Sequence, residues 1–358
     1  MLSRAATSLT LLGRHLERAD HLARILGVHV ALSLDRTDEP GPDFWMRFME
    51  LAGWPGSDTS RRDQAIEMLI TGTLGPSVRA SVAAARLAAQ NVRPSLPSEL
   101  YEQVNALHWR VQESNWQPDL YPFLNAVQLG IRLVDGLVED TMFHDDARDF
   151  VRLGKFIERT ANVTRIVTRK SEELAGSPED PLEWTAVLKS CFAFESYQAR
   201  YSGGVTPERV LTCLMLDPAL PRSARYSADA ALDAVARIDG PHRSKPHRLL
   251  IKLMAMYLKT DALLIAEKPA EFNTECRTLL RQLEVALRET YFHPSKVPTT
   301  VMGEEGRAMP QQQQNGAGET GLPRGTPSRL EYCRRGVAIG CDKVATGMNP
   351  VAPATLDH

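Results

Sequence analysis

Two stretches of the sequence carry ionisable residues of the same kinds at the same spacing. LGRHLERADHLARIL at 12–26 aligns without a gap with LGKFIERTANVTRIV at 153–167. Each stretch contains a glutamate, Glu17 or Glu158, with cationic residues within about two helical turns of it. The other polar candidates are Arg14, Arg18 and Arg24 in the first stretch and Lys155, Arg159, Asn162 and Arg165 in the second. Carboxylates and cations in this pattern can form ion pairs, bind an anion or transfer a proton.

The charged residues of each stretch form a stripe along one side of a helix. At about 100° per residue, Arg24 lies about 20° and Arg14 about 60° from Glu17, with Arg18 about 100° away at the margin. The opposite arc is apolar and contains Leu12, Leu16, Ala19, Ala23 and Leu26. Gly13 and Gly154 lie beside the two stripes. Glycine costs about 1 kcal/mol in a helix interior, so its recurrence at one place indicates a packing reason.

Spacing alone leaves two interpretations of these stripes open. In the first, both stripes face solvent, and their ion pairs each contribute only about 0.2–0.5 kcal/mol. In the second, the stripes meet across a pseudo-twofold axis, and the two glycines allow the close approach of a backbone or a ligand. Because buried charges need partners, such a meeting predicts a buried polar network or an anion-binding pocket.

A metal site is a weaker interpretation of the same residues. Carboxylate-bridged sites in helical bundles use Glu-x-x-His on two helices. Here Glu17 and His21 are four residues apart, and Asn162 stands where a second histidine would be needed. The neighbouring arginines also repel a cation. We therefore expect neither a bound metal nor another cofactor.

A second group of candidates for anion binding lies farther along the chain. It comprises Arg200, Tyr201, Arg222 and Arg225. An arginine can hold a phosphate or carboxylate through paired hydrogen bonds, although a solvated arginine beside a turn is an equal alternative. The sequence contains no P-loop, no G-x-S-x-G and no H-E-x-x-H pattern. Motifs therefore do not support a self-contained enzyme.

The elements that position these residues are all predicted to be helices. Apolar residues recur at steps of three and four from residue 3 to 34 and again from 145 to 174. Further helices are expected at 59–92 (two, broken at 74–76), 98–113, 121–143, 182–200, 207–216, 221–238, 246–265 and 270–291. No segment alternates like a strand. The fold class is therefore all-α, a multi-helix bundle with an internally duplicated long helix.

The C-terminal part of the chain differs from the rest in composition. Residues 302–328 contain QQQQ, several glycines and prolines, and few apolar groups. We predict a helical domain at 1–294, with sub-halves 1–143 and 144–294, followed by a disordered, low-complexity tail at 295–358.

Charge and cysteine content narrow the classes of partner and compartment. The 42 Lys and Arg nearly balance the 44 Asp and Glu, which favours neither nucleic acid nor an anionic membrane surface. Five scattered cysteines fit no zinc or disulfide framework. Neither a signal peptide nor an apolar span is apparent, so we expect a cytoplasmic location. The oligomeric state, homo-oligomers included, stays open.

Four sequence segments resemble the alpha-E domain family of helical bacterial proteins. They are MLSRAATSLTLLGRHLERADHLARIL at the start, LGKFIERTANVTRIV at 153–167, ESYQARYSGGVTPERVLTCLMLDPALPRSARYS at 195–227 and LRETYFHP at 287–294. The resemblance implies an all-helical fold with glutamates prominent in its motifs. Members are typically encoded beside circularly permuted ATP-grasp proteins and transglutaminase-like cysteine proteases. Partners of those two kinds, and a role in peptide ligation or modification, are thus implied by the resemblance.

Three hypotheses for function follow from these observations. The first is an accessory or binding protein that uses the paired Glu/Arg stripes as a polar site or an interface. The second is an enzyme of the same pathway, with Glu17 or Glu158 as general acid or base. That role needs a carboxyl pKa raised by burial, whereas adjacent arginines lower it. The third is a structural bundle in which the glutamates only fix helix packing.

Overall fold

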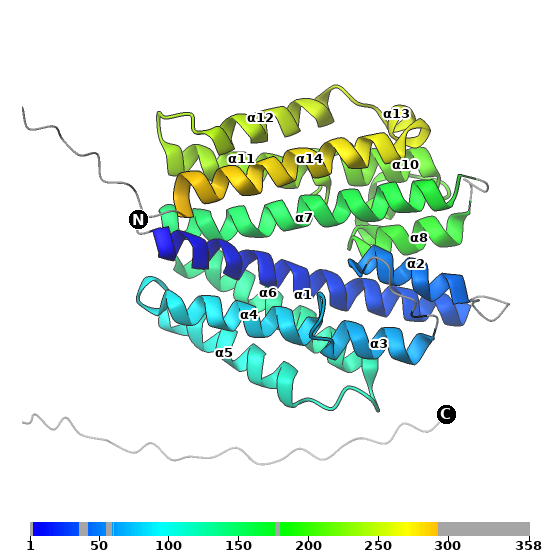
Figure 1. Cartoon of the computed structure of the whole chain (residues 1–358). Coiled ribbons are helices and arrows are strands. Elements are labelled where there is room, and N and C mark those ends of the chain that lie inside the picture. The colour runs from blue at the N-terminus through cyan, green and yellow to red at the C-terminus, as the bar shows by residue number, and fades with distance from the viewer. Residues whose placement is uncertain (1–2, 36–41, 55–58, 60, 176–179, 293–358) are drawn as a thin grey trace, which may run out of the picture. The chain divides into compact units, whose positions relative to one another are not determined.

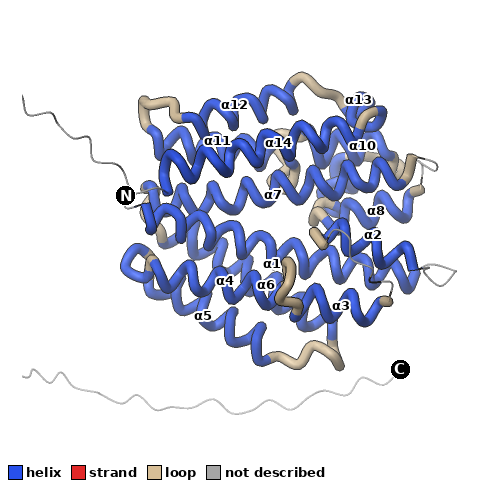
Figure 2. Tube along the Cα trace, in the orientation of Figure 1, coloured by secondary structure: helices blue, strands red, loops and turns tan. Residues whose placement is uncertain are grey.

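The computed structural model describes residues 3–35, 42–54, 59, 61–175 and 180–292 (Figure 1). Within these ranges every regular element is a helix and no strand occurs (Figure 2). The all-α fold class is therefore confirmed. The predicted tail at 295–358 lies outside the described residues.

Two long helices, α1 (Ser3–Asp35) and α7 (Asp146–Glu173), lie side by side in the middle of the bundle (Figure 1). On the side of α1 lie α3 (Arg62–Thr71), α4 (Val78–Asn91), α5 (Ser98–Glu113) and α6 (Leu120–Thr141). On the side of α7 lie α11 (Ala224–Asp239), α12 (Lys245–Leu258) and α14 (Pro269–Leu287). These neighbours cover both long helices, so side chains that would face solvent in a smaller bundle are buried here.

Shorter helices close the end of the bundle at which α1 finishes (Figure 1). They are α2 (Pro42–Ala52), α8 (Pro181–Ser190), α9 (Phe194–Arg200), α10 (Pro207–Leu211) and α13 (Ala262–Glu267). Single π-helical turns follow α10 at Thr212–Leu216 and α14 at Arg288–Phe292, and a 3-10 turn spans Arg93–Ser95.

Local sequence signals explain where many helices begin. The Asp145 carboxylate accepts hydrogen bonds from the Ala147 and Arg148 amides and caps α7. The Ser223 and Ser244 hydroxyls cap α11 and α12 in the same way. Proline in the first turn of α8, α10, α12 and α14 supplies the fixed φ that helix initiation favours.

Three details of the sequence prediction are wrong. The single helix expected at 182–200 is divided because Phe192 adopts a φ of +54°, in the left-handed region that ends a helix. The helix expected at 246–265 is divided before Asp261, whose carboxylate caps α13. Helix α2 was not predicted, because no helix was expected between residues 34 and 59.

The contact between α1 and α7 is closer than side chains on both helices would allow. A Cβ atom on Gly13 would lie 2.0 Å from the Val151 carbonyl oxygen, and one on Gly154 would lie 2.0 Å from the Thr10 carbonyl oxygen. The two contacts correspond to each other, because Gly13 and Gly154, like Thr10 and Val151, are 141 residues apart, the offset that relates the two sequence stretches. The helices therefore meet reciprocally about a local twofold axis, whereas the duplication event itself stays a prediction.

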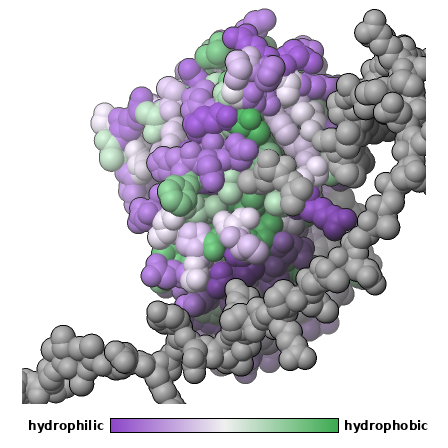
Figure 3. Space-filling model, turned by 90° about the vertical axis from the view of Figure 1, so that its left-hand side faces the viewer, coloured by the Kyte–Doolittle hydropathy of each residue, from purple (hydrophilic) through white to green (hydrophobic). Residues whose placement is uncertain are grey.

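None of the helices in the described part of the chain combines the length and apolarity needed to cross a membrane. The face of the molecule drawn in Figure 3 is largely hydrophilic, with hydrophobic residues scattered over it. All described helices belong to one unit, Met1–Pro298. The domain boundary at 294 and the division into halves remain predictions.

Substitution of the contact glycines tests the role of this close approach. Gly13→Ala or Gly154→Ala should destabilise the protein by about 3 kcal/mol or more, because backbone atoms must move apart to admit the methyl group. Gly136→Ala in α6 is the control, since nothing lies within 4 Å of its Cβ position. That variant should gain up to about 1 kcal/mol from helix propensity. Equal urea unfolding midpoints for the three variants would contradict the close contact.

Candidate functional site

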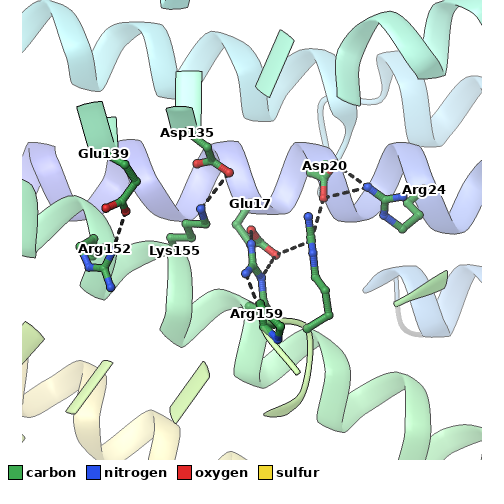
Figure 4. Close-up of polar contacts among 10 residues, drawn as sticks. Glu17, Asp20, Arg24, Asp135, Glu139, Arg152, Lys155 and Arg159 are labelled. Atoms are coloured by element: carbon green, nitrogen blue, oxygen red, sulfur yellow. Dashed lines mark hydrogen bonds and ion pairs between the residues drawn. The ribbon is translucent and has the colours of Figure 1, made fainter. Parts of the chain in front are cut away.

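Glu17 on α1 forms a paired interaction with Arg159 on α7 (Figure 4). Arg159 Nε donates to Glu17 Oε1 at 2.7 Å and Nη2 donates to Oε2 at 2.5 Å. Both residues are buried. Arg222, which precedes α11, adds a second cation 3.6 Å from Glu17 Oε1.

Glu158 on α7 forms the reciprocal interaction with Arg18 on α1. Arg18 Nε donates to Oε1 at 2.8 Å and Nη2 donates to Oε2 at 3.0 Å. Arg14 Nε adds a third hydrogen bond at 3.3 Å. We call the four residues Glu17, Arg18, Glu158 and Arg159 the polar seam. Glu17 binds the arginine that follows Glu158 in sequence, and Glu158 binds the arginine that follows Glu17. The two stripes therefore meet in a buried polar network, as the second interpretation predicted.

The seam arginines determine the charge state of both carboxylates. Burial acts to raise the pKa of Glu17, but Arg159, through its charge and its hydrogen bonds, and Arg222 more than offset this and hold the pKa well below its usual range. Burial likewise acts to raise the pKa of Glu158, and the charges of Arg18 and Arg14 lower it overall. Both glutamates are therefore ionised at neutral pH.

The surroundings of the two glutamates are not equivalent. Glu17 borders a void of about 20 Å³, which it shares with Asp20, Arg159 and Arg222. Glu158 borders two cavities of about 690 and 480 Å³. Gly53 and Arg165 also line both cavities, so these residues and Glu158 lie at the boundary between them. The ion pairs of the two glutamates are symmetric, but the cavities that border them are not.

The larger cavity lies between α1, α7, α14 and the end of α2. Six arginines and three glutamates contribute to its lining. Arg14 joins the seam to α14, because it bonds to Glu158 and also donates to Glu284 Oε1 at 3.0 Å. The smaller cavity is lined by His15, Arg18 and His21 on α1 and by residues of α4. A cationic, partly apolar cavity beside a fixed carboxylate can hold an anionic ligand.

The seam residues Glu17–Arg18 and Glu158–Arg159 each form a Glu-Arg dipeptide. A family model named Alpha-E, described as a predicted alpha-helical domain with a conserved ER motif, matches residues 1–292. The chain belongs to the Alpha-E family. No curated protein and no solved structure matches the chain. Glu208–Arg209 has the same two letters, but it lies on the short helix α10, apart from the seam.

The other predicted stripe residues of this Alpha-E domain have different partners. Arg24 pairs with Asp20 one turn earlier on its own helix, with Nη2 2.9 Å from Oδ1. Lys155 turns toward α6 and pairs with Asp135 at 2.8 Å (Figure 4). Arg165 donates to Asn162 Oδ1 at 3.0 Å. Arg24 and Lys155 are thus outside the seam, whereas Arg165 and Asn162 line the smaller cavity beside it.

The second group of predicted anion-binding residues does not form one site. Arg200 pairs with Asp217 at 2.9 Å, and Arg225 donates to the Leu216 carbonyl oxygen at 3.1 Å. The Tyr201 ring packs against Tyr197, with 4.8 Å between the ring centroids. Arg222 alone reaches the seam, at 3.6 Å from Glu17 Oε1. It also donates to Asp20 Oδ2 at 3.1 Å. Within the Alpha-E domain these four residues mainly satisfy internal acceptors and charges.

Several site residues carry no signal in the local sequence. Asn273, Arg277, Arg281 and Glu284 lie on α14, more than 100 residues from either stripe, yet they line the larger cavity. His15 lines the smaller one. The described residues include no group of three His, Cys, Asp or Glu placed to hold a metal ion. Only the spacing of Asn273, Arg277 and Arg281 at steps of four indicates that they share one face of α14.

Buried histidines make the stability of the Alpha-E domain sensitive to acid. Burial, with a smaller effect of Lys170, lowers the pKa of His29 to about 3. Burial and the charge of Arg18 lower the pKa of His15 to about 4, and burial and Arg165 lower that of His21 well below its usual value. The unfolded chain, with histidine pKa values near 6.5, therefore binds more protons than the folded chain below that pH.

We expect the free energy of unfolding to fall as pH falls from about 6.5 to 5. Each histidine that stays neutral in the folded state should lower the free energy of unfolding by up to about 2 kcal/mol at pH 5. This follows from about 1.4 kcal/mol per pH unit below the unfolded pKa. His29→Gln should reduce the slope of stability against pH, measured by urea unfolding. His242→Gln, at an exposed position, is the control and should leave the slope unchanged. A flat pH profile of the wild type would contradict this expectation.

Proposed function

We propose that this Alpha-E protein is an accessory or binding component of a peptide ligation or modification system. In this proposal it works with ATP-grasp and transglutaminase-like proteins, as the family resemblance implies, and in the cytoplasm, as expected from the sequence. The polar seam holds α1 against α7, and the Glu158 side of the seam presents the ligand site. One observation carries the proposal: of two glutamates with the same ion-pair chemistry, only Glu158 borders the two large cavities.

The charge state of the seam favours binding over acid–base catalysis. A general acid or base works best with a pKa near the operating pH, which for a carboxyl group requires an upward shift. Arginines shift the pKa of Glu17 and Glu158 in the opposite direction. Neither carboxylate then has a proton to donate at neutral pH, so we rank the enzyme hypothesis below the binding hypothesis.

The cavities favour a ligand over a purely structural seam. A seam that only fixed helix packing would need no space on one side of it. The larger cavity, at about 690 Å³, falls within the about 300–1,000 Å³ typical of small-molecule sites. Its excess of arginines over glutamates also supports an anionic ligand.

Matched substitutions of the two seam glutamates test this proposal. Glu17→Gln should lower the free energy of unfolding by about 3 kcal/mol or more, because it leaves Arg159 buried with half its pairing. Activity measured on the folded fraction, in a system reconstituted with the ATP-grasp and transglutaminase-like partners, should persist. Glu158→Gln should lose less stability, since its site is open to the cavities, and should reduce that activity at least tenfold.

Asp135→Asn is the control for loss of an ion pair, because it removes the partner of Lys155 outside the cavities and the seam. It should leave the activity unchanged. If the activity of Glu158→Gln follows its stability as closely as that of Glu17→Gln, the seam is structural and the proposed ligand site is wrong.

A further inference from the structure

One face of α14 presents polar and apolar residues to the larger cavity in a fixed order. Asn273, Arg277 and Arg281 follow at steps of four, and Glu284 and Leu287 continue the same face. The fourteen steps from Asn273 to Leu287 correspond to about 21 Å of helix at 1.5 Å per residue. An extended peptide of about six residues has the same length.

The end of the cavity near Asn273 is cationic. Arg277 and Arg281 lie at its exposed rim, and Arg165 on α7 faces them from the half-buried wall. Among the described residues, no carboxylate oxygen lies within 4 Å of these three arginines in an ion pair. Arg165 and Arg277 lie close enough for each charge to act on the other. Burial contributes most to the lowered pKa of Arg165, the charge of Glu158 opposes the shift, and the charges of Arg18 and Arg277 add to it. An anion between them would relieve this repulsion.

The opposite end of the cavity has an apolar wall. Leu11 of α1, Leu287 of α14 and Phe292 of the following π-helical turn line it, beside Arg288, which pairs with Glu284 at 3.6 Å. The centre contains the network in which Arg14 links Glu158 to Glu284. The two ends differ in chemistry, so the cavity fits an elongated ligand with one anionic and one apolar end.

A buried acceptor marks the cationic end. Asn273 is 6% exposed, and its Oδ1 has no hydrogen-bond partner among the described residues. A buried acceptor without a donor costs about 1–3 kcal/mol. Because the Asn273 side chain lines the cavity, a ligand that donates an N–H or O–H to it would offset this cost. Asn273 stands one turn from Arg277, about 6 Å along the axis. A ligand that carries a donor and an anion side by side therefore fits this end of the cavity.

We propose that the larger cavity binds the free C-terminal end of a short peptide with apolar residues. This inference rests on the proposed function and names the ligand of that same site. The terminal carboxylate lies between Arg165, Arg277 and Arg281, and the last peptide N–H donates to Asn273 Oδ1. The chain then extends along α14 toward Leu11 and Phe292.

A peptide terminus meets these requirements better than a phosphate does. Both can bind arginines, but the oxygens of an ionised phosphate are mainly acceptors and leave Asn273 Oδ1 unsatisfied. A peptide terminus carries an amide donor within a few ångströms of its carboxylate, and its side chains can cover the apolar end.

Fluorescence polarisation with the full chain tests the proposal. The probes are two fluorescein-labelled hexapeptides of alanine ending in leucine, one with a free C-terminus and one amidated, and a fluorescent ATP analogue. The free acid should bind at least about tenfold more tightly than the amide, as expected for the loss of charge-assisted hydrogen bonds. Affinity for the free acid should fall with added salt.

Substitutions in α14 test whether Arg277 and Asn273 contact the bound peptide. Arg277→Gln, at an exposed position, should lower the affinity for the free-acid peptide about tenfold and leave the affinity for the amidated peptide unchanged. Asn273→Leu should weaken both peptides while thermal stability is unchanged or higher, because it removes a buried acceptor without a partner. Lys252→Gln removes an exposed charge on α12, away from the cavity, and should change neither affinity.

The outcomes separate the two proposals. Equal binding of free acid and amide, with no effect of Arg277→Gln, overturns carboxylate recognition and leaves peptide binding intact. Binding of neither peptide overturns this inference and also removes the peptide ligand from the proposed function. Binding of the ATP analogue alone, sensitive to Arg277→Gln, overturns it in favour of a phosphate ligand.

Discussion

The close contact of α1 with α7 is the constraint on which the rest of the structure depends. Gly13 and Gly154 let the backbones meet where a methyl group would collide with a carbonyl oxygen 2.0 Å away. At this separation Glu17 and Glu158 cannot stay in solvent, and a buried carboxylate needs a partner of opposite charge. Each helix supplies that partner to the other, so packing and electrostatics favour the same register.

The twofold symmetry holds only for the seam itself, because the surrounding helices differ on its two sides. On the Glu17 side, Asp20 and Arg222 fill the space and leave a void of about 20 Å³. On the Glu158 side, Arg14 reaches α14 and the cavities remain open. One copy of the motif therefore acts mainly on stability, while the other is placed to act on a ligand. A symmetric scaffold with asymmetric surroundings supports a binding role without requiring catalysis.

Sequence and structure agree best where a local signal dominates. The apolar periodicity located α1 and α7, the break at 74–76 separates α3 from α4, and Asp145 caps α7 as an N-terminal aspartate should. Prediction was wrong where a single backbone conformation decides, as at Phe192, whose positive φ divides a segment of continuous helical composition. Nothing in the residue type of a phenylalanine indicates that conformation. In the fold the Phe192 ring lies against the guanidinium groups of Arg24, Arg132 and Arg222, which come from distant parts of the sequence.

The all-helical fold, the two matching stretches and the candidate Glu/Arg residues could all be read from the sequence, because they depend on residue spacing along one helix. The sequence could not decide whether the stripes face solvent, since burial depends on α4, α6, α11 and α14. Only the tertiary structure paired each glutamate with the arginine of the other stretch and turned Lys155 toward Asp135. It alone brought Asn273 and Arg277 into the lining of the cavity beside Glu158, because a cavity is formed by helices distant in sequence and no local pattern encodes it.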